Sequence, residues 1–254
     1  MEFDCNQTGK MLVCNGRQMK GGARMKRRYE WLHLWRSLAV LIMVVFHALW
    51  DMEWFGILPE GTMATPAADI ARYIGGGSFI LISGMLALRS ERSLRRGFYL
   101  LCLGLAVESA TSIAGMPVRF GILQLLGICM IICGALRNRL LSLSGRGFTA
   151  ICILLFFGTW VLTARSRVLW RFLYPLGLRS EDFYSADYWP LLPWAFLYLL
   201  GTQFGNSLLR DREENRERKI PAALTFPGRH SLVIYLLHQP LLFGLCYLFI
   251  SGKN

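Results

Sequence analysis

The stretch that decides the fold is residues 34–51, LWRSLAVLIMVVFHALWD. Apart from Arg36, His47 and Asp51 it carries no ionisable side chain. A helix that crosses the hydrocarbon core of a bilayer needs about 20 mostly apolar residues. The stretch therefore predicts a membrane-spanning helix, and its ionisable residues become functional candidates because charge is costly in a bilayer.

The composition of the whole chain extends this interpretation. Of its 254 residues, 54% are hydrophobic and 17% are charged, against about 25% charged in soluble domains. Mean hydropathy is +0.39. We expect an all-α, polytopic bundle of about seven transmembrane helices. The predicted spans are residues 32–50, 72–88, 97–114, 119–136, 147–163, 189–208 and 230–251.

The net charge of +12 is explained by topology. Most of the 28 lysine and arginine residues lie in a polar N-terminal stretch and in three loops that alternate spans place on one side. Because basic loops stay cytoplasmic, the N-terminus is predicted inside and the C-terminus outside. Residues 1–28 are predicted to be a disordered basic tail before a membrane domain at 29–254. Membrane lipids are the expected partners of these charges, and nucleic acid is not needed.

The seven cysteines favour neither a disulfide framework nor a metal centre. Five of them lie inside apolar runs, where cysteine usually acts as a small packing residue. Cys129 and Cys133 share a helix face, but no histidine or second cysteine pair accompanies them. No metal site is predicted.

The first span carries the strongest catalytic candidates. His47 follows Arg36 by about 16 Å of helix, and the two side chains lie within about 20° of one face. Asp51 is one turn further on, where its carboxylate could hydrogen-bond the imidazole and raise its basicity. The alternative is an interfacial histidine beside Trp50, with Arg36 reaching the lipid headgroups.

The last span adds a second group of polar residues. Residues 227–231, with Gly228, Arg229, His230 and Ser231, are predicted to open it. Free backbone N–H groups and a guanidinium at a helix start can hold a phosphate. His238 is predicted about 12 Å deeper. A structural histidine bonded to a neighbouring helix is the alternative for His238.

Candidates on the other spans are weaker. Glu108 lies within an apolar run and needs a partner, whereas Arg119 and Gln124 begin the next span from outside. Asp187 and Tyr188 precede a run of tryptophans and prolines that suits either an interfacial belt or sugar stacking. The glycines at 75–77 and at 84 predict close helix packing rather than a nucleotide-binding loop.

Taken together, these segments resemble a known family. The chain is similar to the bacterial DUF1624 proteins, which belong with the catalytic domain of heparan-α-glucosaminide N-acetyltransferase. The resemblance covers about residues 30–250 and rests on several motifs in order. They are LWRSLAV through FHALWD (34–51), SFILISG (78–84), FGILQLLG (120–127), SADYWPLLPW (185–194) and GRHSL through YLLHQP (228–240).

This resemblance implies an acetyl-CoA-dependent acyltransferase of the bacterial cytoplasmic membrane that acetylates a sugar on the far side. The arginine–histidine spacing of the first span also resembles that of the wider membrane acyltransferase superfamily. By this analogy His47 is the catalytic histidine, as general base or transient acetyl carrier, and Arg36 with Arg229 contacts the CoA phosphates. The expected sites are catalytic His47 and Asp51; donor-binding Arg36, Arg229, His230, Ser231 and His238; and acceptor-binding Arg119, Gln124, Asp187 and Tyr188.

The chain departs from the family in two respects. Gln124 stands where family members often carry a histidine, which puts acid–base chemistry at that position in doubt. The chain is also much shorter than the eukaryotic enzyme and is expected to have no lumenal domain. An envelope glycan or glycolipid is therefore a better expected acceptor than heparan sulfate.

Two other classes of protein remain open. Small bundles with buried Arg, His and Asp residues also serve as transporters or flippases, although the chain shows no inverted repeat. A non-catalytic membrane partner of an envelope enzyme is the third reading. The glycine clusters permit a homo-oligomer without predicting one.

Overall fold

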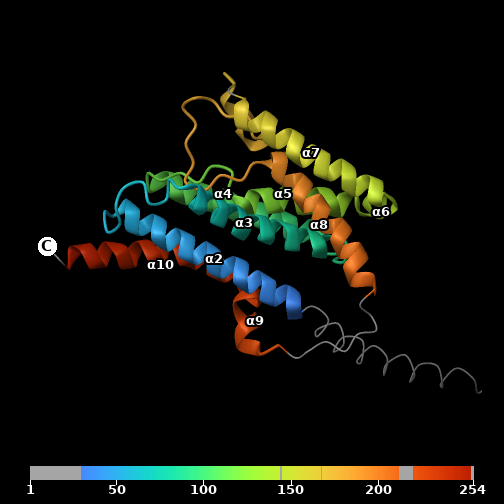
Figure 1. Ribbon diagram of the computed structural model, residues 1–254, viewed down its shortest axis with the longest axis horizontal. Helices are drawn as coiled ribbons and strands as arrows, with labels where there is room; N and C mark the ends of the chain where they lie inside the picture. The colour runs from blue at the N-terminus through green and yellow to red at the C-terminus, as the bar shows by residue number, and fades with distance from the viewer. Residues whose placement is uncertain (1–29, 144, 167, 212–219, 253–254) are drawn as a thin grey trace, which may run out of the picture. The chain divides into compact units, whose positions relative to one another are not determined.

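A computed structural model describes residues 30–143, 145–166, 168–211 and 220–252, and this part of the chain is helical without a strand (Figure 1). The predicted tail at residues 1–28 lies outside the described residues. Within the all-helical fold, contacts group the described residues into two compact units, the first of residues 30–60 with 220–252 and the second of the described residues from 61 to 211.

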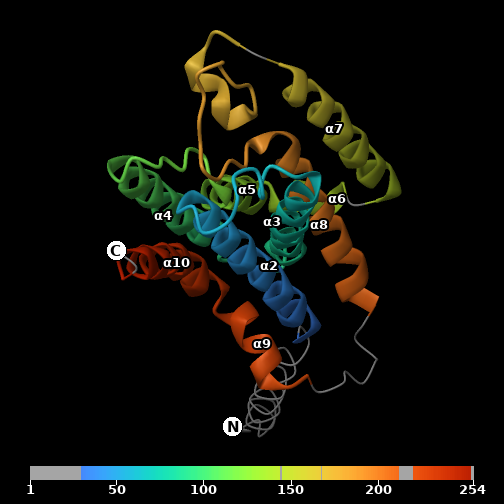
Figure 2. The same cartoon turned by 60° about the vertical axis from the view of Figure 1, so that its left-hand side comes forward.

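The first unit is built on the N-terminal helix. α2 (Glu30–Trp54) lies beside α10 (Ser231–Ser251), and the short α9 (Ala222–Arg229) packs on α2 (Figures 1 and 2). α9 approaches α2 closely because Gly228 rests on the carbonyl of His33, where a Cβ atom would collide. The unit therefore joins the two ends of the described chain through helix–helix packing.

The second unit contains the remaining helices. α3 packs on α8, α4 packs on α5, and α7 packs on α8. α7 lies beside α8 in both views (Figures 1 and 2). The elements are α3 (Pro66–Ala87), α4 (Ser93–Ile113), α5 (Ile122–Ala135), α6 (Arg137–Ser142), α7 (Arg146–Arg165), the 3-10 helix η1 (Arg171–Leu176) and α8 (Leu191–Asp211).

Glycines bring α3 and α8 together, as the sequence predicted for the second span. Gly84 on α3 faces the backbone carbonyl of Tyr198, and on α8 Gly205 faces the carbonyl of Met85. Side chains at these positions would separate the two backbones. Small residues that allow such close approach are typical of helix pairs in membranes, where apolar burial alone provides little driving force.

Each of the predicted spans contains a helix, but the helices differ in their suitability for crossing a membrane. Four are long and apolar enough: α2, α3, α7 and α10. α5 is apolar but has only 14 residues. On α7 and α10 only 11% of the apolar window is buried inside the protein, as expected for helices that face lipid. The total of seven spans and the orientation of the termini remain predictions.

Candidate functional site

Two histidines meet in the first unit. His47 on α2 and His238 on α10 have ring centroids 4.9 Å apart, with the planes inclined at 76°. His238 is buried at 8% exposure, and His47 is partly buried. Sequence analysis assigned these residues to catalysis and to donor binding respectively. The structure brings them together as a pair.

The backbone fixes which ring nitrogen of each histidine is reactive. Nδ1 of His47 lies 2.9 Å from the carbonyl oxygen of Met43, and Nδ1 of His238 lies 2.7 Å from that of Tyr235. A carbonyl can only accept a hydrogen bond, so each Nδ1 carries the proton and donates it. In the neutral ring this leaves Nε2 with its lone pair.

For His238 this lone pair is enclosed within the protein. Its Nε2 is buried and has no hydrogen-bond partner among the described residues. Buried polar atoms are usually paired, and one that is not calls for an explanation such as a catalytic role or a missing ligand. Nε2 of His238 is therefore a hydrogen-bond acceptor that no described group of the surrounding helices occupies.

The predicted hydrogen bond between Asp51 and His47 is wrong. The His47 ring bonds to Met43, one turn before it, rather than to Asp51, one turn after it. Side chains on a helix lean toward its N-terminus, so the carbonyl of the preceding turn is within easier reach. The backbone of α2, and not a carboxylate, orients this imidazole.

Asp51 bonds to the other helix of the pair instead. Its Oδ1 accepts a hydrogen bond of 2.8 Å from Nε2 of Gln239 on α10. The residue is 1% exposed, and its Oδ2 has no hydrogen-bond partner in the described part of the chain. The carboxyl group thus connects α2 to α10 through Oδ1, one turn beyond His47, and its Oδ2 can still accept a hydrogen bond.

A basic region lies toward the other end of α2. Arg229 at the end of α9 approaches Glu30 at 4.0 Å, and its side chain is 46% exposed. His33 interacts electrostatically with both Arg36 and Arg229. Two guanidinium groups therefore lie near one imidazole, about 16–21 Å along α2 from His47 at 1.5 Å per residue.

The segment that was predicted to open the last span belongs to two helices. Gly228 and Arg229 form the last turn of α9, and α10 begins only at Ser231. His230 lies at the junction between them, and its ring contacts that of Phe226 at a tilted angle, with ring centroids 4.5 Å apart. The N–H of Gly228 donates to Oγ of Ser37 on α2 at 2.8 Å, so this glycine serves helix packing.

In the second unit, Gln124 has structural partners. Its Oε1 accepts a hydrogen bond from the Gly121 N–H at 2.7 Å, and its Nε2 donates to Glu108 Oε2 at 2.7 Å. The first bond caps α5, and the second supplies the partner that Glu108 needs in an apolar helix. The side chain is 2% exposed, which leaves little of it for a substrate.

The other proposed acceptor residues lie around the loop before α8. The backbone of Arg119 exchanges hydrogen bonds with the Ser185 hydroxyl, and its side chain is exposed. Asp187 accepts from the Trp189 indole N–H. Tyr188 donates to the Tyr174 carbonyl, and burial raises the pKa of its hydroxyl. Arg119 is thus the acceptor candidate with a solvent-accessible charge.

The aromatic run after Tyr188 packs inward. Trp189 and Trp194 are 3% and 6% exposed, and their ring centroids lie 4.6 Å apart. Tyr73 on α3 contacts both rings. These tryptophans therefore form part of the core of the second unit, and neither a belt at the membrane surface nor a sugar platform accounts for them.

Sequence reasoning missed three contributors to the site. Gln239 lies within the YLLHQP motif that supports the family resemblance, but its bond to Asp51 depends on how α10 meets α2. Glu30 and Ser37 drew no attention, although both contact the α9 segment. The position of Ser37, one residue after Arg36 in the first span, was the available signal.

Within the described part of the chain, no group of three or more His, Cys, Asp or Glu side chains could hold a metal ion.

Helices that suit a bilayer, together with a pair of histidines of which one is buried and the other partly buried, define a polytopic membrane protein with a polar site among its helices. The family model described as heparan-alpha-glucosaminide N-acetyltransferase, catalytic, matches residues 28–240. The chain therefore belongs to this family, which confirms the resemblance and places it among the transmembrane acetyltransferases. The match contains both histidines and ends at Pro240, just after Gln239. No curated protein and no solved structure matches the chain.

Proposed function

We propose that the protein transfers an acetyl group from cytoplasmic acetyl-CoA to an amine or hydroxyl of an extracytoplasmic sugar or glycolipid in the bacterial cytoplasmic membrane. The observation that carries this proposal is the pair of His47 and His238, each anchored through Nδ1 to a backbone carbonyl. A neutral imidazole with a free Nε2 lone pair is the side chain most often used as a general base.

Acetyl transfer from a thioester requires the protein mainly to position the two reactants and to supply a base. The acceptor nitrogen or oxygen attacks the thioester carbonyl carbon, and His47 Nε2 takes the proton that the acceptor loses. The carbon–sulfur bond then breaks, and the CoA thiolate leaves and takes up a proton. If His47 is instead an acetyl carrier, its Nε2 attacks the thioester carbon, the carbon–sulfur bond breaks and the CoA thiolate leaves. The acceptor then attacks the acetyl-imidazole, the bond from the acetyl carbon to Nε2 breaks, and the neutral imidazole is restored as the acceptor loses its proton.

The basic region supports the donor side of the proposal. Arg36 and Arg229 would contact the phosphates of CoA, because guanidinium groups pair well with phosphate oxygens. The Arg229 side chain is half exposed, and its 4.0 Å contact with Glu30 is long enough to be exchanged for a phosphate. The pantetheine arm would then run along α2 over the distance of about 16 Å between Arg36 and His47.

The acceptor side rests on fewer observations. Arg119 presents an exposed charge beside Asp187 and Tyr188 at the loop before α8. We assign these side chains to recognition of a polar acceptor. Gln124 belongs to the support of that region, since both ends of its amide bind protein groups.

Binding of acetyl-CoA to the purified protein in detergent is the first test, with free CoA and ATP as comparison ligands. Saturable binding that CoA displaces better than ATP is expected. Absence of binding in a preparation shown to be folded would overturn the proposal in favour of a transporter.

Transfer of radiolabelled acetyl to glucosamine, as an amine probe, follows in the same preparation. His47→Ala should retain binding and lose transfer. Quenching of the wild-type protein in cold denaturant at neutral pH, without acceptor, separates the two routes, because a carrier mechanism leaves label on the protein and a direct mechanism leaves none. Normal transfer by His47→Ala would contradict the assignment.

A further inference from the structure

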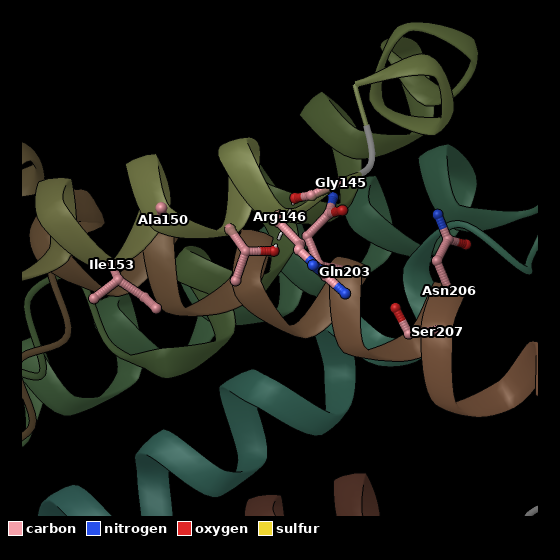
Figure 3. A pocket seen from close by; sticks show the side chains of 8 residues that line it. Gly145, Arg146, Ala150, Ile153, Gln203, Asn206 and Ser207 are labelled. Carbon is pink, nitrogen blue, oxygen red and sulfur yellow. Dashed lines mark hydrogen bonds between the residues drawn. The ribbon is translucent and has the colours of Figure 1, made fainter.

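A cleft between α7 and α8 is separate from the histidine pair and is not used by the proposed reaction. It has a volume of about 490 Å³ and lies within the second unit. Arg146 and Thr149 come from α7, and Gln203, Asn206 and Ser207 come from α8 (Figure 3). The polar side chains gather where the first turn of α7 passes α8.

The polar side chains of this cleft are available for a ligand. Arg146 is exposed, and no carboxylate pairs with it among the side chains that the structure describes. Gln203 is 5% exposed, and within the same part of the chain its carboxamide makes one long hydrogen bond, of 3.4 Å to Thr202. A cation at the rim and a buried amide at the floor suit a negatively charged, oxygen-rich group.

The rest of the cleft is apolar. Ala150 and Ile153 line it from α7, and Ile153 is 43% exposed. α7 is one of the helices able to span a membrane, and it begins at Arg146. A membrane-spanning α7 would place Arg146 near the headgroup level and Ile153 about 10 Å further along the helix, toward the hydrocarbon.

We propose that this cleft binds an anionic phospholipid. The phosphate would pair with the Arg146 guanidinium and accept hydrogen bonds from Asn206 and Ser207, while an acyl chain would run along Ala150 and Ile153. Guanidinium groups bind phosphate oxygens in a planar, two-point geometry. A soluble phosphate ester would use the rim of the cleft and leave its apolar length unoccupied.

Native mass spectrometry of the detergent-purified protein tests the proposal, with phosphatidylglycerol and phosphatidylcholine of identical acyl chains as probes. The wild-type protein should retain phosphatidylglycerol preferentially. Arg146→Gln should reduce that preference about fivefold, the effect of one cation near an anionic headgroup. Arg165→Gln, at the other end of the same helix, is the matched control and should retain the preference.

Three further measurements complete the test. Ala150→Leu fills the apolar part of the cleft and should weaken binding of both lipids. Arg146→Lys keeps the charge and should restore part of the preference, which separates loss of the site from loss of folding. Equal effects of Arg146→Gln and Arg165→Gln would overturn the proposal. So would displacement of phosphatidylglycerol by inorganic phosphate or CoA, which would assign the cleft to a soluble phosphate compound.

Discussion

Each of the two units contains a glutamine side chain that is hydrogen-bonded to a carboxyl group, and the two pairs differ in how many of their polar atoms have partners. In the second unit, Gln124 bonds to Glu108 and also caps α5, so both ends of its amide have partners. In the first unit, Gln239 bonds to Asp51, but Oδ2 of Asp51 and Oε1 of Gln239 remain without partners among the described residues.

We interpret the Gln124–Glu108 pair as support for the fold and the Gln239–Asp51 pair as part of the candidate site. A fully bonded pair stabilises the helices that carry it, and it loses those bonds if a substrate intervenes. Buried polar atoms without partners lower stability and are retained where chemistry or a ligand uses them. Nε2 of His238, the residue before Gln239, is a third buried polar atom of the first unit without a partner among the described residues.

Replacement of the central histidine should have the largest effect. His47→Ala removes the proposed base, so the rate of acetyl transfer should fall about 10²- to 10⁴-fold. Radiolabel transfer measures this rate, and acetyl-CoA binding should change little. His33→Ala, which removes an imidazole from the same helix, is the control and should lose far less. Equal losses in the two variants would abolish the distinction between site and scaffold within α2.

Disruption of the Gln124–Glu108 pair in the second unit should lower the unfolding free energy of the protein. Gln124→Leu leaves the Gly121 N–H and the Glu108 carboxylate without partners, which should cost about 2–5 kcal/mol in unfolding free energy. Thermal or denaturant unfolding in detergent measures it. Gln203→Leu removes a buried glutamine that makes one long bond and should cost less. If Gln124→Leu unfolds like the wild type but loses transfer, Gln124 belongs to the site.

Two substitutions in the Asp51–Gln239 pair of the first unit should show whether this pair serves stability, activity or both. Gln239→Leu leaves Asp51 without its hydrogen bond, and we expect a loss of about 1–3 kcal/mol in unfolding free energy. Asp51→Asn can keep a bond to Gln239 and should stay folded while it removes the charge. Lower transfer by folded Asp51→Asn would support a catalytic role for the carboxylate. Unchanged transfer would mean that Asp51 serves only to connect α2 and α10 through its hydrogen bond with Gln239.

The smallest effect is expected at the basic region. Arg229→Ala removes one of two guanidinium groups near His33 and should weaken acetyl-CoA binding about three- to tenfold, since a partly exposed charge contributes about 1 kcal/mol. Arg171→Ala breaks a comparable exposed pair with Asp182 and is the control. Binding isotherms for both variants decide the point, and equal affinities would remove Arg229 from the donor site.

Most of the fold could be predicted from the sequence because apolar runs of membrane length are a strong signal. Helices were expected at every span and are present there. The short α9 was not expected, since its segment is only eight residues long and contains Pro227 and Gly228. Gly228 was interpreted as part of an anion site, whereas its absence of a Cβ atom allows α9 to approach the carbonyl of His33. Such a contact depends on tertiary packing and leaves no local pattern.

The candidate site was predictable in its residues but not in its contacts. His47, Asp51 and His238 stood out as costly groups in apolar helices. The partner of each was not evident, because helical spacing gives residues that share a face and does not decide which bond forms. Asp51 and His47 are one turn apart, yet both bond elsewhere. The pairing of His47 with His238 joins residues far apart in the chain, for which spacing carries no information.

The carbonyl of Met43 has a consequence for how this site could be altered. In the serine-protease triad an aspartate side chain holds the histidine in its working tautomer, and one substitution removes it. Here the peptide group of Met43 holds the imidazole of His47, and every residue type supplies a peptide carbonyl. A replacement of the Met43 side chain therefore leaves the tautomer unchanged. The orientation of the ring is lost only when the helical turn itself unwinds, so the geometry of the base is as durable as α2.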